Sequence, residues 1–332
     1  MLFSRRRSRA RATLGTAIYT GFLARAARSG VTEVAAFGSN PGALRMLVHA
    51  PARLPAGRPL VVVLHGCGQD AETFAADAGW LALAAQFRLA LLLPQQTYEN
   101  NRGRCFNWFR PDDVRRGGGE AMSIRQMLRH AVGRFGSDPR RIFIVGFSAG
   151  AGMAAALLAA YPAVFAAGAV VAGTPVGCAR TRMGAMLHMR QAGSQRTRMA
   201  LAEDVRAASR SRTRPRLHPR TVWPRLSIWH GERDRTVDPG NAEALAAQWS
   251  ELHGHGPAPS RDEVSPGVRH RSWGRPNRPS AVELWTIAGI GHGFPVDART
   301  QASGRVGPWV VDAGLSAAQA MAAFWGLDRP GA

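Results

Sequence analysis

The stretch IFIVGFSAGAG, residues 142–152, places one serine in a glycine frame between two different kinds of sequence. Before it, four apolar residues of high β-propensity lead into Gly146, and an alanine-rich run follows Gly150. The change of pattern predicts a buried strand, a tight turn at Ser148 and then a helix. Side chains at the two glycine positions would collide with the neighbouring strand and helix, so the glycines keep this turn compact.

Five more apolar runs have the length and composition of strands that are buried on both faces of a sheet. They occupy residues 59–69, 89–96, 165–175, 225–234 and 282–292. Helical patterns separate them at 71–87, 120–136, 151–162 and 241–254. Strands that alternate with helices predict an α/β fold with a mostly parallel central sheet and helices on both faces. The alternating stretch at 45–51 is predicted to add an antiparallel edge strand.

Two segments interrupt this rhythm inside the single catalytic domain that we expect over residues 31–328. Residues 180–224 are an Arg-rich insertion after the strand that follows the serine helix, with one weak helical pattern at 198–209. We expect it to pass over the upper edge of the sheet, with a plain surface insertion as the alternative. Residues 255–280 are rich in Pro, Gly, Ser and Arg and are predicted to form a loop.

The charge of the chain is strongly positive. Its 332 residues carry a formal net charge of +21, and all 43 basic side chains are arginine. Two blocks, residues 1–30 and 180–225, hold many of these arginines but lack the interleaved aromatic residues of a nucleic-acid reader. We therefore expect no nucleic-acid partner. Solvated basic segments are the simplest interpretation, and contact with an anionic granule or membrane surface is the alternative.

The N-terminal segment 1–30 is basic, and it is predicted to be flexible or peripheral. Its apolar stretch at 12–24 is interrupted by threonines and glycines, so it matches a secretory signal poorly and is too polar and short to span a membrane. We expect a cytoplasmic protein, with secretion as the alternative. The three cysteines form no CxxC pair or Cys/His cluster, so neither a metal site nor another cofactor is predicted.

Residues 146–150 match the G-x-S-x-G pattern of a nucleophilic serine at the start of a helix. A serine needs a base, and in this architecture the chain order is Ser, acid, His. Asp234 follows the strand at 225–234 more closely than Asp238, which is interpreted as a turn or cap residue. His292 lies between glycines after the last predicted strand. The sequence thus predicts a Ser148–His292–Asp234 triad, while His230, ending the Asp234 strand, is assigned a structural hydrogen bond.

Two backbone amides are predicted to bind the oxyanion that forms when this serine attacks a carbonyl. One is the amide of Ala149, directly after the nucleophile. The other is the amide of Cys67, in the HGCG loop that follows the early strand. The Cys67 thiol is not interpreted as a nucleophile, because the serine already has a complete set of partners.

Taken together, these motifs resemble the polyhydroxybutyrate (PHB) depolymerase family of serine esterases within the α/β-hydrolases, over roughly residues 35–327. VLHGCGQ resembles the oxyanion loop of the family, GFSAGAGM its nucleophile turn, WHGERDRTV its acid motif and GIGHGF its base loop. CFNWF at 105–109 resembles a Cys-Trp-Asn-Trp-Phe box, with Phe106 in place of the first Trp. The resemblance implies hydrolysis of poly(3-hydroxybutyrate) or other short-chain polyhydroxyalkanoates.

The same resemblance implies that Trp108 lines the ester pocket and that Phe106 and Trp309 add to it, with packing in the core as the alternative for all three. Extracellular relatives add a linker and a second domain, and this sequence ends at residue 332 without them. We therefore expect action on amorphous granules, soluble oligomers or small esters. Feruloyl, acetylxylan, general short-chain and peptidase-like hydrolysis on the same triad are the enzymatic alternatives. A basic binding module is the non-enzymatic one.

Two cysteines, Cys105 and Cys178, both follow core strands at the upper edge of the predicted sheet. They are predicted to form either a disulfide or, in a reducing cytosol, two free thiols. No pattern in the sequence indicates the oligomeric state.

Overall fold

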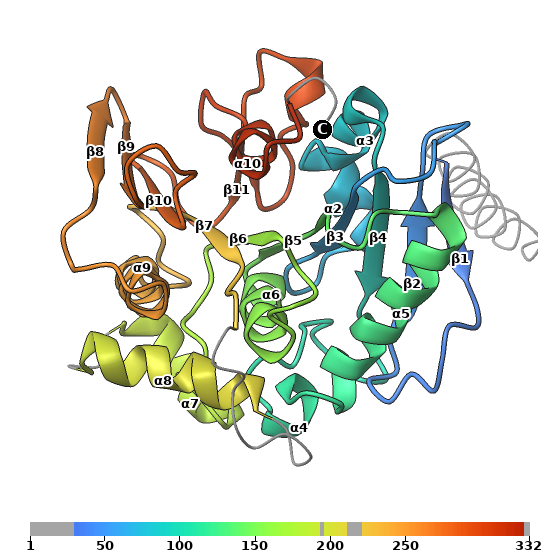
Figure 1. The fold of residues 1–332 in the computed structure, drawn as a ribbon, viewed down its shortest axis with the longest axis horizontal. Coiled ribbons are helices and arrows are strands. Elements are labelled where there is room, and N and C mark those ends of the chain that lie inside the picture. Colours follow the sequence, from blue (N-terminus) through green and yellow to red (C-terminus); the bar gives the residue numbers. More distant parts are fainter. Residues whose placement is uncertain (1–29, 193–195, 211–220, 329–332) are drawn as a thin grey trace, which may run out of the picture.

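The computed structural model describes residues 30–192, 196–210 and 221–328 of the chain. The basic N-terminal segment therefore lies outside the described residues, apart from Gly30. Within the described ranges, one ten-stranded sheet has the order β1-β2-β4-β3-β5-β6-β7-β10-β9-β8 (Figure 1). Its strands are β1 Val31–Val34, β2 Arg45–His49, β3 Leu60–Leu64, β4 Ala90–Gln95, β5 Ile142–Phe147, β6 Ala167–Val171, β7 Arg225–Gly231, β8 Arg261–Ser265, β9 Val268–Trp273 and β10 Val282–Ile287.

The centre of the sheet is parallel, as the apolar runs predict. The strands β4, β3, β5, β6, β7 and β10 pair in parallel, and every residue of β3, β4, β5 and β6 is buried. Because the carboxyl ends of parallel strands meet at one edge, the loops after β3, β4, β5, β6, β7 and β10 gather there. A second, two-stranded sheet joins β11 (Phe294–Val296) to β12 (Val310–Asp312).

Helices cover both faces of the sheet, which gives the molecule two hydrophobic cores. Side chains of α5 (Gly119–Phe135), α6 (Ala149–Ala160), α8 (Arg198–Ser209) and α9 (Gly240–Leu252) fill one core. Side chains of α2 (Ala71–Asp77), α3 (Trp80–Phe87) and α10 (Ala317–Trp325) fill the other. Figure 1 shows the first group in the lower half of the view and the second in the upper half. This is the layered architecture of an α/β-hydrolase.

One predicted helix is divided in two. The pattern at 71–87 forms α2 and α3, which are separated at Gly79 in a left-handed conformation with φ of 85°. A Cβ at Gly79 would come within 2.8 Å of the Ser303 carbonyl oxygen. Only glycine tolerates both the backbone angle and this close approach, so the chain turns here.

The expected edge strand at 45–51 is antiparallel but is not at the edge. The strand β2 pairs with β4 on one side and with β1 on the other, so β1 forms the edge of the sheet. The expectation missed β1 because its four residues, VTEV, are only partly buried and give too short a pattern to distinguish from a loop.

The prediction of a loop at 255–280 is wrong in the centre of this range. There, β8 and β9 form an antiparallel hairpin at the other edge of the sheet. All five residues of β8 are exposed, so no apolar alternation marks the strand. Charged pairs hold the two strands of the hairpin together instead. For example, the guanidinium of Arg269 lies 2.7 Å from the carboxylate of Asp262. An exposed edge that carries charges also discourages pairing with other chains.

Within the described residues, the Arg-rich insertion contains two helices, α7 (Arg182–Arg190) and α8. The pattern at 198–209 coincides with α8, which packs on α6 and α9 and buries Leu201, Ala202 and Val205. The insertion therefore widens one helix layer instead of only passing over the edge of the sheet. None of the helices in the described ranges is both long and apolar enough to cross a bilayer.

Candidate active site

Ser148 occupies a strained turn between β5 and α6. Its φ is 55° and its ψ is −118°, a conformation that non-glycine residues adopt only when the surroundings enforce it. A Cβ at Gly146 would collide with the backbone of Gly150, and one at Gly150 with the carbonyls of Leu64 and His65. The collisions predicted from the sequence are therefore present, and they hold the serine at the carboxyl edge of the sheet.

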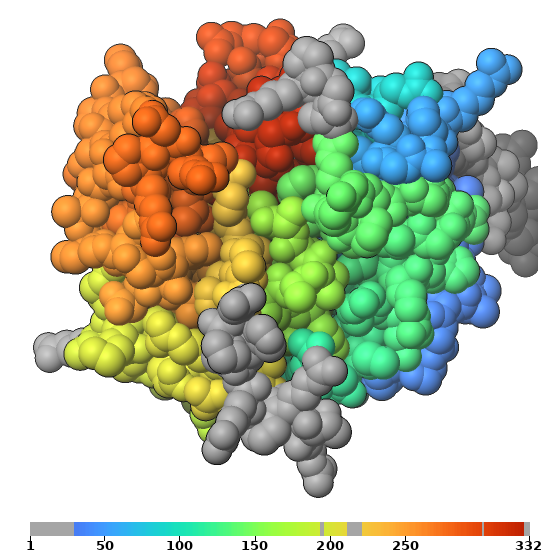
Figure 2. Space-filling model, in the orientation of Figure 1, coloured from blue at the N-terminus to red at the C-terminus, as the bar shows by residue number. Residues whose placement is uncertain are grey.

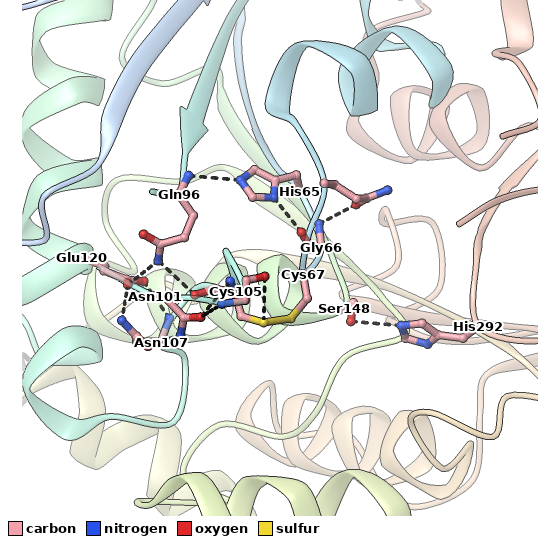
Figure 3. The surroundings of a disulfide bond; sticks show 12 residues. His65, Gly66, Cys67, Gln96, Asn101, Cys105, Asn107, Glu120, Ser148 and His292 are labelled. Carbon is pink, nitrogen blue, oxygen red and sulfur yellow. Dashed lines mark hydrogen bonds between the residues drawn. A yellow bond between two sulfur atoms is a disulfide. The ribbon is translucent and has the colours of Figure 1, made fainter. Parts of the chain in front are cut away.

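The other two predicted residues meet this serine from separate loops. Asp234 follows β7 and His292 follows β10, and these two strands are neighbours in the sheet. The His292 Nε2 lies 3.0 Å from Ser148 Oγ, and its Nδ1 lies 2.7 Å from Asp234 Oδ2. Figure 3 shows the contact between serine and histidine beside the disulfide loop. The fold thus brings together three residues that span 144 positions of sequence.

The carboxyl group of Asp234 is buried and strongly held. Burial alone would raise its pKa, but hydrogen bonds from His230 and His292, and from the Val237 amide, lower the pKa well below its usual range. Two backbone amides, those of Thr236 and Val237, donate to Oδ1 at 2.8 and 2.9 Å. The group is therefore a fixed anion beside the imidazole, which suits it to orient His292 and to stabilise the imidazolium.

His230 contacts the candidate acid, although no sequence pattern indicates this contact. Its Nε2 lies 2.9 Å from the Val237 carbonyl oxygen and 3.2 Å from Asp234 Oδ2. Because both neighbours accept, Nε2 carries the proton and donates it between them. The structural hydrogen bond assigned to His230 is therefore present, and it also positions the acid.

A second buried histidine orients the predicted oxyanion loop. The amide of Gln96 donates to His65 Nε2 at 3.1 Å, so Nδ1 carries the proton and donates it to the Gly66 carbonyl at 2.7 Å. Burial lowers the pKa of His65 to about 4, which keeps the ring neutral. The Gly66 carbonyl and the Cys67 amide belong to the same planar peptide, so fixing one points the other in the opposite direction.

The amides of Cys67 and Ala149 donate no hydrogen bond within the part of the chain that the structure describes. The neighbouring Gly66 amide, by contrast, is used by the Gln69 side chain at 2.7 Å. Two unengaged donors beside a serine at a helix N-terminus form the arrangement that stabilises an oxyanion.

The disulfide joins Cys67 to Cys105, not Cys105 to Cys178 (Figure 3). The reason is the strand order. Cys67 follows β3 and Cys105 follows β4, and these strands are adjacent, whereas Cys178 follows β6, which β3 and β5 separate from β4. Cys178 is a free thiol, and burial raises its pKa to about 12. The disulfide therefore ties the oxyanion loop to the CFNWF segment.

Behind the disulfide, a buried carboxyl group anchors the CFNWF segment, and nothing in the sequence analysis indicated it. Glu120 accepts from the Asn107 amide at 2.9 Å and from the side-chain amides of Asn107, Gln96 and Asn100 at 2.7, 2.7 and 2.9 Å. Burial raises the pKa of Glu120 to about 7, against the lowering effect of these hydrogen bonds. Gln96 also donates to the Cys105 carbonyl. Figure 3 shows this network beside the disulfide.

The three predicted aromatic residues have different environments. Trp108 is half-buried against Gly152 of α6, where a Cβ would come within 2.7 Å of its ring. It lines a cavity of about 340 Å³ together with Phe109, α6 and α8. Phe106 has no exposed surface and packs 5.0 Å from the His65 ring, so the expectation that it lines the pocket is wrong. Its core position explains why another large aromatic replaces the Trp of the motif.

Trp309 lies beside the candidate catalytic histidine and is not among the residues that line the Trp108 cavity. Its side chain is 50% exposed, its φ is 66°, and its ring meets the His292 ring edge-on at 5.9 Å. With the Cys67 loop and α2 it lines a second cleft of about 280 Å³. An exposed aromatic ring in a strained backbone conformation beside a candidate catalytic histidine is typical of a functional contact. No group of three metal-binding side chains occurs among the described residues.

Comparison with known proteins identifies the family of the chain. The family described as Esterase PHB depolymerase matches residues 46–263. Poly(3-hydroxyalkanoate) depolymerase C of Paucimonas lemoignei is 38% identical over 90% of this chain and 70% of its own. Feruloyl esterase B of Thermothelomyces thermophilus is 31% identical over 85% of this chain and 94% of its own.

A solved structure supports the fold independently of these sequences. The acetyl xylan esterase from Aspergillus awamori superposes with a TM-score of 0.73 over 90% of this chain and 99% of its own, at 22% identity. At this low sequence identity, the superposition shows a shared fold only. With the family match over most of the sheet and the serine elbow, the chain belongs to the PHB depolymerase family of esterases, within the α/β-hydrolase fold.

Proposed function

We propose that Ser148, His292 and Asp234 hydrolyse the ester bonds of poly(3-hydroxybutyrate) and other short-chain polyhydroxyalkanoates through an acyl-enzyme. The observation that carries this proposal is the position of the His292 imidazole, which bridges the serine hydroxyl and the buried carboxylate. The relative named as a poly(3-hydroxyalkanoate) depolymerase supports the substrate class.

In the acylation step, His292 Nε2 removes the proton of Ser148 as Oγ attacks the ester carbonyl carbon. The C=O π bond opens, and the oxygen takes the negative charge. The amides of Cys67 and Ala149 then donate to this oxyanion, and such a donor contributes about 3 kcal/mol of transition-state stabilisation. Asp234 stabilises the positive imidazolium without taking its proton.

The imidazolium next returns the proton to the alkoxy oxygen, the C–O bond breaks, and the alcohol leaves. Water then enters, gives a proton to His292 and attacks the acyl carbon, which releases the acid and restores Ser148. Because His292 protonates the leaving group, the alcohol part of the substrate lies on the histidine side. We assign the Trp309 cleft to the alcohol part and the Trp108 cavity to the acyl part.

A second candidate function rests on the chemistry of the Trp108 cavity. Trp108 and Phe109 meet edge-to-face at 5.6 Å and would stack against the ring of an aromatic acyl group. The feruloyl esterase relatives give this alternative its substrate, a feruloyl ester. Acetylxylan, simple short-chain ester and peptidase-like substrates remain further alternatives on the same triad.

The location of the protein is a separate proposal. Disulfides persist in oxidising compartments and are rare in the cytosol, so Cys67–Cys105 supports the secreted alternative over the cytoplasmic expectation. Mass mapping after alkylation of protein taken from each compartment tests it. A blocked Cys67–Cys105 pair outside the cytosol is the expected result, and two alkylated thiols in the cytosol would restore the earlier expectation.

The function is tested with Ser148→Ala and a panel of soluble hydroxybutyrate oligomers, feruloyl esters, p-nitrophenyl butyrate and an aminoacyl amide. Ser148→Ala should lower ester turnover by about 10⁴-fold or more, while the exposed Ser265→Ala, the matched control, keeps it. A fluorophosphonate should label the wild type once, on Ser148. Preference for feruloyl esters would replace the proposed substrate class, and near-normal turnover by Ser148→Ala would refute the triad.

A further inference from the structure

The helix α7 presents its apolar side chains to the solvent. Met183 is 67% exposed, Met186 44% and Leu187 61%. These positions have the i, i+3, i+4 spacing that places residues on one helix face. The opposite face buries only Ala185, with Met189 half-buried beside it. A surface helix normally turns its apolar face inward, so the orientation of α7 is inverted.

The apolar residues on α7 are part of a local concentration. The described residues contain nine large apolar side chains that are strongly exposed, and four of them lie between residues 183 and 199. Scattered exposed apolar residues need no explanation, whereas a gathered patch indicates contact with a partner. We define the α7 patch as Met183, Met186 and Leu187 with the neighbouring Arg180, Arg182 and Arg190.

The arginines of the α7 patch give it a positive rim. Arg180, Arg182 and Arg190 are exposed, and none forms an ion pair with the described residues. The other arginines of the insertion in those ranges are paired with Asp204, Glu251 or Glu203.

No acidic residue occurs between positions 180 and 202. Among the described residues, Asp204 lines the same cavity as Arg180 but pairs with Arg196. Two further acids approach α7 from neighbouring segments, and both are already engaged. Asp238 accepts from the Gly240 amide, and Glu243 pairs with Arg271. The positive charge of the rim is therefore left for a partner.

The patch is held at the edge of the sheet that carries the triad. Thr181 caps α7 by accepting from the Gly184 amide at 3.1 Å. At the other end, the Met189 carbonyl accepts from the Asp238 amide at 2.6 Å, four residues after Asp234. Arg180 also lines the Trp108 cavity. Figures 1 and 2 show the insertion on the outside of the molecule, in yellow-green and yellow at the lower left.

We propose that the α7 patch adsorbs the protein to the surface of solid polyester, with the Trp108 cavity beside the chains to be cleaved. This proposal rests on the proposed function. A polyester surface is mainly alkyl and ester, and each hydrolysis leaves a carboxylate chain end, so it matches an apolar face with a cationic rim. Unbranched methionine side chains adapt to an irregular amorphous surface better than branched ones.

The experiment measures adsorption separately from catalysis. In a Ser148→Ala background, which leaves the surface intact, binding to amorphous poly(3-hydroxybutyrate) particles is compared between the parent and the triple variant M183Q/M186Q/L187Q. Val264→Gln, which is 78% exposed on the edge hairpin, is the matched control. The triple variant should bind at least about tenfold more weakly, and the control should bind like the parent.

The charge of the rim is tested with R182Q/R190Q and salt. Raising NaCl from about 20 to about 500 mM should weaken adsorption of the parent to the level of R182Q/R190Q. The adsorption of R182Q/R190Q itself should change little with salt. In the Ser148 enzyme, both variants should keep kcat/KM on the soluble hydroxybutyrate trimer within about twofold, because no substituted side chain touches the triad.

Four results would overturn the proposal. They are unchanged particle binding by the triple variant, a parallel loss of soluble activity, preferential binding of the parent to phosphatidylglycerol vesicles, and a parent dimer that the triple variant abolishes. Failure of the proposed function would look different, because the Ser148 enzyme would then leave the soluble trimer uncleaved. Retained trimer cleavage with unchanged adsorption would remove only the role of the α7 patch.

Discussion

The segments that follow β5 and β6 leave the same edge of the sheet and use their side chains in opposite ways. After β5, all twelve residues of α6 are buried, and the glycines beside Ser148 leave no room for a single carbon. After β6, α7 buries one residue and exposes its apolar face. The difference teaches that the core fixes the position of the candidate nucleophile Ser148, where little can change, whereas few core contacts constrain the outer face of α7.

The largest effect is expected where the elbow is tightest. Gly150→Ala would push a Cβ into the carbonyls of Leu64 and His65, so it should prevent folding or cost more than about 5 kcal/mol. Soluble yield and urea unfolding followed by tryptophan fluorescence measure this. The matched control is Gly133→Ala in α5, where a Cβ meets nothing within 4 Å and should stabilise by up to about 1 kcal/mol. A well-folded Gly150→Ala would show that the elbow is looser than its geometry indicates.

The next effect concerns the disulfide beside the elbow. It closes 38 residues of chain, so the double variant Cys67→Ser/Cys105→Ser should lose about 4 kcal/mol of unfolding free energy on the chain-entropy account. Its esterase kcat should also fall, because the Cys67 amide loses one of its two restraints and keeps only the peptide orientation set by His65. Reductant should destabilise Cys178→Ala as much as the wild type. If reductant leaves both unchanged, the disulfide does not support the oxyanion loop.

A smaller, pH-dependent effect is expected at Glu120. Glu120→Gln places an NH₂ group against amide donors, which should cost about 1 to 3 kcal/mol at pH 5. Because burial raises the pKa of Glu120 from 4.5 to about 7, the native state holds its proton longer than the unfolded state. The contribution of Glu120 is complete below pH 4.5 and is lost as the pH rises through 7.

The cost of Glu120→Gln should therefore shrink between pH 5 and pH 8, as measured by urea unfolding at each pH. The exposed Glu99→Gln in the loop after β4 is the control and should change stability little at either pH. A cost that stays constant from pH 5 to pH 8 would mean that the amide cluster holds Glu120 as an anion throughout this range.

The smallest effect on stability is expected in the insertion. Met183→Gln removes a side chain that is 67% exposed, so the free energy of unfolding should stay within about 0.5 kcal/mol of the wild type. Thermal unfolding measures it, and Ala185→Gln on the buried face of the same helix is the comparison, with a loss of at least about 1 kcal/mol. Equal losses at both positions would show that the outward face of α7 is also packed.

The triad could be predicted because each member follows a buried strand and the chain order is constrained. Ser148, Asp234 and His292 all lie in short loops whose positions depend on local patterns. The supporting groups could not be found in this way. His65 and Glu120 both bond to Gln96, which only the assembled sheet brings near, whereas His230 bonds to Val237 and Asp234 in the loop that directly follows its own strand. The sequence surroundings do not distinguish any of the three from ordinary core polar residues.

The disulfide, whose existence the sequence left open and whose true pair Cys67–Cys105 was not considered, shows the same limit. The positions of Cys105 and Cys178 after core strands were correct, but pairing depends on which strands are neighbours. The order β4-β3-β5-β6 places Cys105 beside Cys67 and leaves Cys178 distant. The hairpin at 261–273 was missed for a different reason, because an exposed edge held by charged pairs leaves no apolar period to read.

By itself, the sequence determined the parallel α/β core, the serine turn and the order of its partners, because burial and backbone sterics act over short stretches of chain. The tertiary structure alone decided the partner of Cys105, the burial of Phe106, the separate cavities that Trp108 and Trp309 line, and the outward face of α7. These features depend on contacts between segments distant in sequence, and such contacts exist only once the sheet has its order and the helices have covered it.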